Sequence, residues 1–139
     1  MNESHIRQRL EEILSAIQFL EELIAMGKDE FLADRRNIYA ARHLIVQIIE
    51  ASSDISEEII LQNALPLGEE AKTLYFQLYK LGIIPKSLAT HFKKATGLRN
   101  LLVHQYWAID DKKMYSDIGK GIKNFKEFIN SITAYLLRK

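Results

Sequence analysis

The stretch ESHIRQRLEEILSAIQFLEELIAM, residues 3–26, decides the fold class of this chain. Its apolar side chains recur at steps of three and four, which places them on one face of an α-helix. They are Ile6, Leu10, Ile13, Ile17, Leu20 and Ile24. Gly27 follows at once and is a typical stop at the C-terminal end of a helix. The stretch therefore predicts a long amphipathic helix whose apolar face packs in a helical bundle.

The same spacing continues along the chain. A second helix is predicted from a cap at Asp34 to about Ser53, and a third from about Glu69 to a stop at Gly82. The last helix, capped by Asp110 or Asp111, repeats the spacing in Ile118, Ile122, Phe125, Ile129, Ile132 and Leu136. A further helix precedes it from Lys86, and no stretch alternates at period two as a strand would. The expected fold is an all-α, up-and-down bundle of four main helices, in four or five pieces.

Length and composition indicate a single domain spanning residues 1–139. The chain has no cysteine, which excludes disulfides and thiolate metal sites. It also lacks a run of about 18 apolar residues that could span a bilayer, and an apolar signal core at its start. We expect a protein that is not embedded in a membrane and that works in the cytoplasm.

Charge is distributed unevenly, although the net charge is only +1. Residues 91–126 hold eight Lys or Arg against three Asp, a local charge of +5. Such clustering suits a phosphate substrate, but a run of charges is also common on any solvated helix face. No Glu-x-x-His, His-Glu-x-x-His or Walker pattern occurs, so we expect neither a metal nor a cofactor.

Side chains that could take part in catalysis cluster in RNLLVHQY, residues 99–106. Histidine can take and return a proton near neutral pH, and arginine offers a planar fork of donors to a phosphate. Arg99 and His104 could therefore cleave RNA without a metal: the 2′-hydroxyl attacks the adjacent phosphorus, histidine acts as acid or base, and arginine stabilises the phosphorane. Asn100 could orient the imidazole or the substrate.

Helix geometry limits this hypothesis. On a regular helix, Arg99 and His104 lie about 140° apart, so they meet at one phosphate only if Arg99 bends round or a second protomer helps. Gly97 could interrupt the helix and change that angle. The alternative is purely structural: a packed histidine, a snorkelling arginine, an aromatic Tyr106 at the edge of the core, and Trp107 buried by packing.

The run GLRNLLVHQYWAID, residues 97–110, resembles the signature of the HEPN superfamily, an Arg followed by a polar residue and then a His. More narrowly, its Arg-x4-His-x-Tyr pattern resembles the HepT-like toxin family. The likeness extends to FLADRR at residues 31–36 and to LYKLGIIP at residues 78–85, so it covers most of the chain.

The resemblance implies an endoribonuclease toxin with Arg99, Asn100 and His104 as catalytic residues and RNA, transfer RNA included, as substrate. It further implies a homodimer with facing motifs, and a partner nucleotidyltransferase of the MNT type that silences the toxin by attaching AMP to Tyr106. An anionic nucleotide two residues from His104 would repel RNA. The alternative is a helical dimer that binds a nucleotide or the nucleotidyltransferase and does no chemistry.

Overall fold

The computed structural model describes residues 3–138 and confirms the all-α fold, with no strand in that range. Its elements, in chain order, are α1 (Glu3–Ala25), α2 (Lys28–Ala33), α3 (Arg35–Gln62), α4 (Ala71–Lys80), α5 (Lys86–His104), the 3-10 helix η1 (Tyr106–Ala108) and α6 (Asp111–Leu137). No helix of this part of the chain is both long and apolar enough to cross a membrane.

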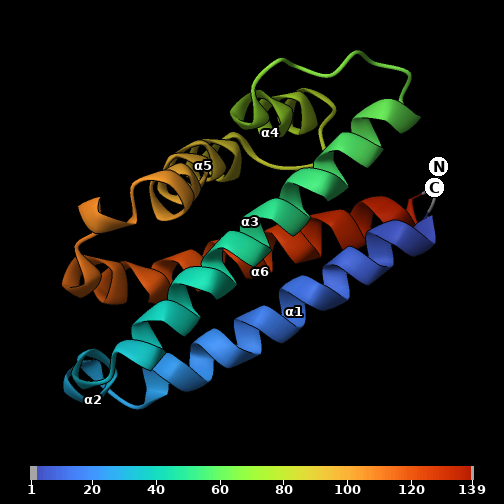
Figure 1. Ribbon diagram of the computed structural model, residues 1–139. Coiled ribbons are helices and arrows are strands. Elements are labelled where there is room, and N and C mark those ends of the chain that lie inside the picture. The colour runs from blue at the N-terminus through green and yellow to red at the C-terminus, as the bar shows by residue number, and fades with distance from the viewer. Residues whose placement is uncertain (1–2, 139) are drawn as a thin grey trace.

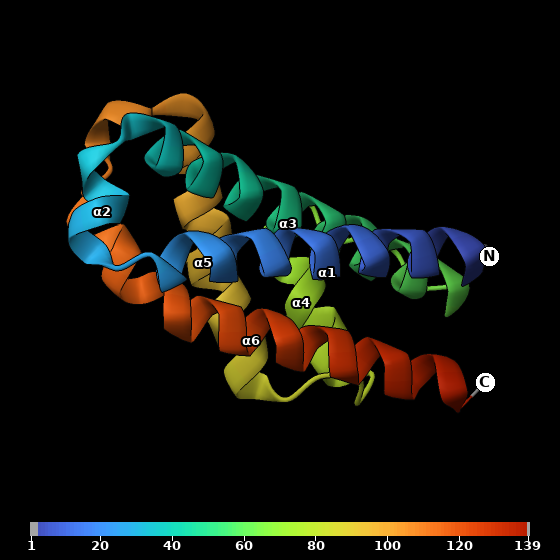
Figure 2. The ribbon, with the colours of Figure 1, turned by 90° about the horizontal axis from the view of Figure 1, so that it is seen from below.

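Three long helices, α1, α3 and α6, run lengthwise through the molecule, and both ends of the chain lie at one end of it (Figure 1). The short helix α2 closes the opposite end, between α1 and α3 (Figure 1). Helices α4 and α5 pair with each other and cross the long helices at a steep angle (Figure 2). This crossing brings the C-terminal end of α5, where the motif lies, against the first half of α3.

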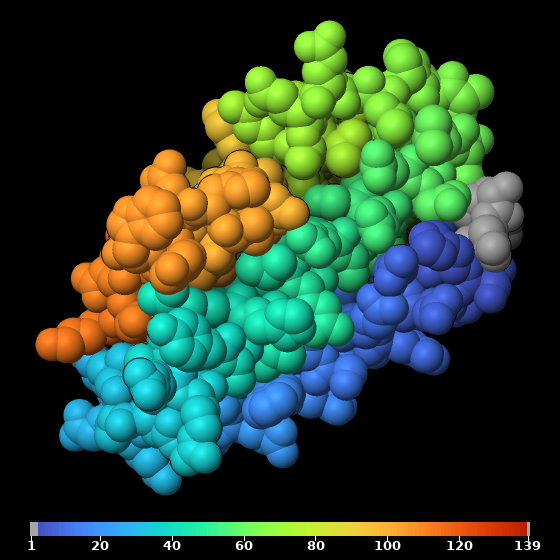
Figure 3. Space-filling view, in the orientation of Figure 1, coloured from blue at the N-terminus to red at the C-terminus, as the bar shows by residue number. Residues whose placement is uncertain are grey.

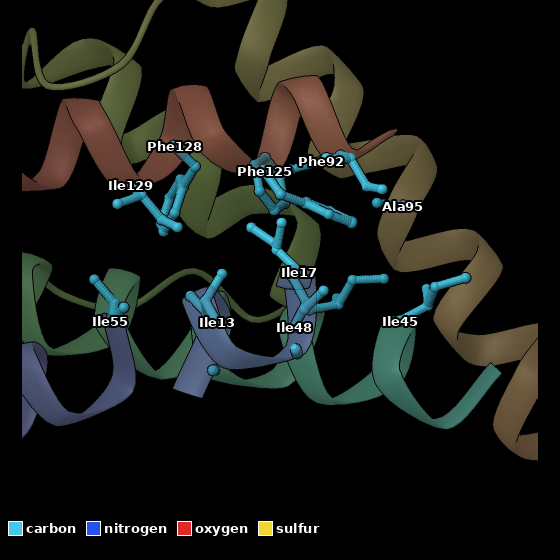
Figure 4. Close-up of a cluster of buried hydrophobic side chains, with 14 of the residues drawn as sticks. Ile13, Ile17, Ile45, Ile48, Ile55, Phe92, Ala95, Phe125, Phe128 and Ile129 are labelled. Atoms are coloured by element: carbon cyan, nitrogen blue, oxygen red, sulfur yellow. The ribbon is translucent and has the colours of Figure 1, made fainter. Parts of the chain in front are cut away.

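The core is formed by the predicted apolar faces (Figure 4). Ile13 and Ile17 of α1 meet Ile48 of α3, while Phe92 of α5 and Phe128 of α6 close the other side, all nearly inaccessible to solvent. Phe92 also stacks on Tyr75 of α4, with ring centroids 4.5 Å apart. Burial of large apolar side chains from five helices fixes their relative positions and leaves the polar faces outside.

The predicted end of the second helix near Ser53 is wrong, because α3 continues to Gln62. Asp54 and Ser56, which suggested a break or a fresh cap, lie inside the helix. The buried hydroxyls of Ser52 and Ser56 donate to the carbonyls of Ile48 and Ser52, both at 2.8 Å. A hydroxyl bonded to the carbonyl four residues back is satisfied within the helix, so it does not end the helix.

Other boundaries follow the predictions more closely. Asp34 caps α3 by accepting from the backbone N–H of Arg36 at 2.9 Å, and Asp110 caps α6. Gly27 and Gly82 have φ of +94° and +76°, the left-handed conformation that ends α1 and α4. Gly97, in contrast, does not interrupt α5, which is continuous from Lys86 to His104. The separate short helix α2 was not predicted.

Candidate active site at the end of α5

The last two turns of α5 carry Arg99, Asn100 and His104. Leu102 anchors these turns in the core, and Ala95 and Phe92 do so about two and three turns earlier. Arg99 lies on the side of α5 that faces α3, where its Nη2 donates to Glu50 Oε1 at 2.7 Å. In Figure 3 the end of α5 and η1, in orange, lie directly against α3, in teal. The motif is thus held between the core and α3.

Asn100 contacts the arginine and not the histidine. Its Oδ1 accepts from Arg99 Nη1 at 3.3 Å, so the guanidinium is held from two sides. The orientation of the imidazole by Asn100, one of the two roles considered from the sequence, is not what this structure shows. The Arg99 side chain is 29% exposed, which leaves part of its fork accessible to a ligand.

His104 is the last residue of α5 and lies exposed on the surface. Its ring has no hydrogen bond to any of residues 3–138, so both ring nitrogens are available to a ligand. Because α5 is regular to this point, Arg99 and His104 keep the separation of about 140° around the helix axis that the spacing gives. Among residues 3–138, the hydrogen-bond partners of Arg99 are Asn100 and Glu50, and His104 is not one of them.

Beyond His104 the chain leaves α5, so the regular helix assumed for the motif does not extend to Tyr106 and Trp107. Gln105 adopts φ −141° and ψ 50°, and its N–H still donates to the carbonyl of Leu101 at 2.8 Å. Tyr106 and Trp107 then form η1, with their rings in a T-shaped contact at 5.4 Å. They are 55% and 72% exposed, so Trp107 is not buried by packing as predicted.

Arg42 of α3 fixes this turn. Its Nη1 donates to the Tyr106 carbonyl at 3.0 Å, and its Nη2 and Nε donate to Asp111 Oδ1 at 2.7 and 3.1 Å. Only 13% of the Arg42 side chain is exposed. One guanidinium therefore joins α3, η1 and the first turn of α6, and it determines where the Tyr106 hydroxyl is presented.

Sequence reasoning missed Glu50 and Arg42. Both lie on the polar side of an amphipathic helix, where a charged residue is the rule. Their partners Arg99 and Tyr106 are 49 and 64 positions away, so no local spacing links them. Among residues 3–138 there is no group of three His, Cys, Asp or Glu side chains that could hold a metal.

Comparison with known proteins assigns the chain to a family. Residues 13–132 match the family described as "Ribonuclease HepT-like". The chain belongs to the HepT-like ribonuclease family. A tRNA nuclease HepT of Aphanizomenon flos-aquae is 26% identical over 134 residues, 95% of this chain and 90% of that relative. An mRNA nuclease HepT of Shewanella oneidensis is 28% identical over 85 residues, 61% of this chain and 64% of the relative.

Solved structures agree with the HepT-like fold. A tri-AMPylated HEPN toxin of Shewanella oneidensis, in complex with an MNT antitoxin, superposes with a TM-score of 0.88. That match covers 96% of this chain and 99% of the other, at 23% identity. The two chains therefore share one arrangement of helices. The resemblance to the HepT-like family, which the motif indicated, is confirmed.

Proposed function

We propose that this HepT-like protein is a metal-independent endoribonuclease and the toxin of a toxin–antitoxin pair. The observation that carries the proposal is the placement of Arg99 and His104 at one end of α5, with both histidine nitrogens and part of the arginine fork open to solvent. RNA as the substrate is supported by two similar proteins, the tRNA nuclease HepT of Aphanizomenon flos-aquae and the mRNA nuclease HepT of Shewanella oneidensis. With RNA as its substrate, we propose that the protein acts in the cytoplasm.

The proposed reaction needs one proton acceptor, one proton donor and a charge clamp. The ribose 2′-oxygen forms a bond to phosphorus as its proton passes to a histidine, and the bond from phosphorus to the 5′-oxygen breaks as that oxygen receives a proton. The products are a 2′,3′-cyclic phosphate and a free 5′-hydroxyl. Arg99 donates to the non-bridging oxygens, whose negative charge grows in the transition state. Asn100 holds the guanidinium for this task.

A homodimer supplies the second histidine and brings the two motifs together. Around the motif, four large apolar or aromatic side chains are exposed together: Leu101 37%, Val103 43%, Tyr106 55% and Trp107 72%. A patch of this kind favours an interface between proteins. If two copies of α5 face each other there, the His104 side chains of both copies and an Arg99 can lie at one phosphate. One histidine then accepts the 2′-hydroxyl proton, the other donates a proton to the 5′-oxygen, and the separation of Arg99 and His104 around one helix is no longer a difficulty.

The test is cleavage of labelled tRNA and messenger RNA in EDTA by wild type and His104→Ala. Intact mass must first show that neither preparation carries AMP, and circular dichroism that both are folded. His43→Ala is the matched control, because His43 is an exposed histidine on the adjacent α3. We expect cleavage by wild type and His43→Ala alone. If His104→Ala also cleaves RNA, His104 is not the catalytic group. If wild type does not cleave RNA either, the alternative of a non-catalytic dimer that binds a nucleotide replaces this proposal.

We further propose that an MNT-type nucleotidyltransferase silences the toxin at Tyr106. The tyrosine oxygen attacks the α-phosphorus of ATP, pyrophosphate leaves, and the hydroxyl proton passes to solvent or to the transferase. The Tyr106 side chain is exposed and two residues from His104, so the added AMP places a negative charge beside the imidazole. The AMPylated state of the Shewanella oneidensis toxin supports this regulation.

Mass spectrometry after incubation with ATP and the transferase tests the modification. We expect Tyr106→Phe to stay unmodified and to remain toxic in the presence of the transferase. Tyr39→Phe is the control, since Tyr39 is 58% exposed, closely matching Tyr106. AMP on Tyr106→Phe would move the modification to another hydroxyl.

A further inference from the structure

A groove of about 1050 Å³ lies between α5 and α6, on the side of α5 away from Glu50. Its floor is apolar and includes Phe125, Met114 and Ile118, and one end is formed by Ala108 and Ile109, directly after Tyr106 and Trp107. Helix α5, which carries the motif, lines the groove with Leu98 and Leu101. The groove therefore adjoins the end of α5 and the turn that follows Tyr106, although Arg99, Asn100 and His104 do not line it.

Three lysines line this groove. Lys94 comes from α5, and Lys120 and Lys113 come from α6. None of the three forms an ion pair among residues 3–138, although other lysines of the chain do, as Lys126 does with Glu21. Of the two carboxylates that line the groove, Asp110 is engaged as the cap of α6. Asp117 remains as the single unengaged acidic group.

His91 adds a buried donor. The amide of Asn124 donates from Nδ2 to His91 Nδ1 at 3.0 Å, so the proton of the neutral imidazole resides on Nε2. That Nε2 is buried and has no hydrogen-bond partner. Burial, followed by the charges of Lys94 and Lys120, lowers the pKa of His91, which means that both lysines act on the imidazole from opposite walls. A buried donor without an acceptor is costly unless a ligand satisfies it.

We propose that His91, Lys94 and Lys120 form a second phosphate subsite, which holds an RNA phosphate away from the bond that is cut while the attached base rests on the apolar floor. The inference rests on the proposed ribonuclease function. Lys94 and His104 are ten residues apart on one helix, about 15 Å along its axis, so one phosphate cannot reach both. The subsite therefore holds a neighbouring nucleotide of the same strand, and it contributes to affinity and to the choice of RNA.

Binding of a 2′-O-methyl RNA oligomer, which cannot be cleaved because its 2′-oxygen is blocked, tests the subsite by fluorescence anisotropy. The double variant Lys94→Ala/Lys120→Ala should bind about tenfold more weakly and show a smaller salt dependence, by roughly 0.7 for each phosphate that is no longer neutralised. The control is Lys93→Ala/Lys123→Ala, which removes the same charge from exposed positions on the same helices outside the groove. Equally weakened binding by the two double variants would overturn the proposal, because it would show diffuse attraction only.

The variant His91→Phe distinguishes the role of the Nε2–H donor of His91 from the role of its ring in packing. Phenylalanine can keep the edge contacts that His91 makes with Phe92 and Phe125 but has no N–H. We expect a folded variant, checked by its unfolding temperature, with several-fold weaker RNA binding. Unchanged affinity would show that His91 has a structural role alone and would remove it from the subsite.

Competition by AMP and by inorganic phosphate identifies the source of the phosphate. If the site binds RNA, AMP or inorganic phosphate should displace the oligomer only at concentrations far above the concentration at which the oligomer itself binds. If AMP binds as tightly as RNA and loses its affinity in Lys94→Ala/Lys120→Ala, the groove is a mononucleotide site and the RNA assignment fails. These binding results do not depend on cleavage, so absence of cleavage by wild type would overturn the proposed function without deciding the subsite.

Discussion

The guanidinium of Arg99 and the carboxylate of Glu50 lie 2.7 Å apart, so the arginine proposed to hold the scissile phosphate already has an anionic partner. RNA must replace that carboxylate or share the guanidinium with it. Glu50 thus has two opposing effects: it orients the fork of Arg99, and it competes with the substrate. The isosteric amide separates the two effects, because it keeps an acceptor oxygen and removes the charge.

We predict that Glu50→Gln binds uncleavable RNA roughly twofold to fivefold more tightly than wild type, in keeping with the value of up to about 1 kcal/mol typical of exposed ion pairs. Anisotropy titrations at two salt concentrations measure the change. The control is Glu57→Gln, an exposed glutamate two turns further along α3. Weaker binding by Glu50→Gln would mean that orientation of Arg99 by the full charge outweighs competition.

Arg42→Ala should destabilise the protein by about 1–3 kcal/mol, because it leaves Asp111 and the Tyr106 carbonyl without their part-buried donor. It should also slow attachment of AMP to Tyr106 more than it slows RNA cleavage, since η1 loses its fixed position. Urea unfolding and the two rates measure these effects. Arg36→Ala is the control, because Arg36 is 89% exposed and pairs with Asp34 on the surface. Similar destabilisation of both variants would contradict the role assigned to Arg42.

Gly97→Ala should stabilise the fold by about 0.5–1 kcal/mol. Gly97 lies inside the continuous helix α5, and a Cβ built there meets no atom within 4 Å. Gly82→Ala should do the opposite, since Gly82 has φ +76° where a side chain is strained. Thermal unfolding of the two variants compares them directly. Destabilisation by Gly97→Ala would mean that flexibility at this point of the motif helix is required.

We predict that the free energy of unfolding depends on pH through His91. Its pKa is lowered in the folded protein by burial and by Lys94 and Lys120, below the ordinary histidine value of about 6.5. Between these two pKa values the unfolded chain binds the proton and the folded chain does not, so stability falls as pH falls through that window. An NMR titration gives the folded pKa, and denaturation at pH 7.5 and 5 gives the stability. The His91→Phe difference between the two pH values should be smaller than that of wild type.

Much of the fold could be predicted from the sequence because apolar spacing reports burial directly. The stripe from Ile6 to Leu20 and the stripe from Ile118 to Leu136 are buried as expected. The error at Ser53 arose because the sequence does not reveal whether a serine hydroxyl satisfies a carbonyl inside a helix or ends it. The end of α5 at His104 could not be predicted, because aromatic residues such as Tyr106 and Trp107 continue a helical pattern whether or not the backbone does.

The candidate site was predictable only where its residues are neighbours in the chain. Arg99, Asn100 and His104 fall within six positions and form a pattern, and their catalytic roles stay predictions until His104→Ala is assayed. Glu50 and Arg42 reach the motif through tertiary contacts, which the spacing of one sequence does not contain. The groove residues His91, Lys94 and Lys120 were visible only as part of a charge cluster, because their convergence depends on how α5 crosses α6.

The two contacts from α3 also constrain how the chain can change in length. Arg42 and Glu50 are eight residues apart on one continuous helix, about 12 Å along its axis. One residue inserted between them would turn Glu50 by about 100° relative to Arg42 and shift it by about 1.5 Å, so η1 and Arg99 could not both keep their partners. Related chains that share this site should therefore tolerate insertions after the end of α3, in the exposed loop before α4, and not between these two residues.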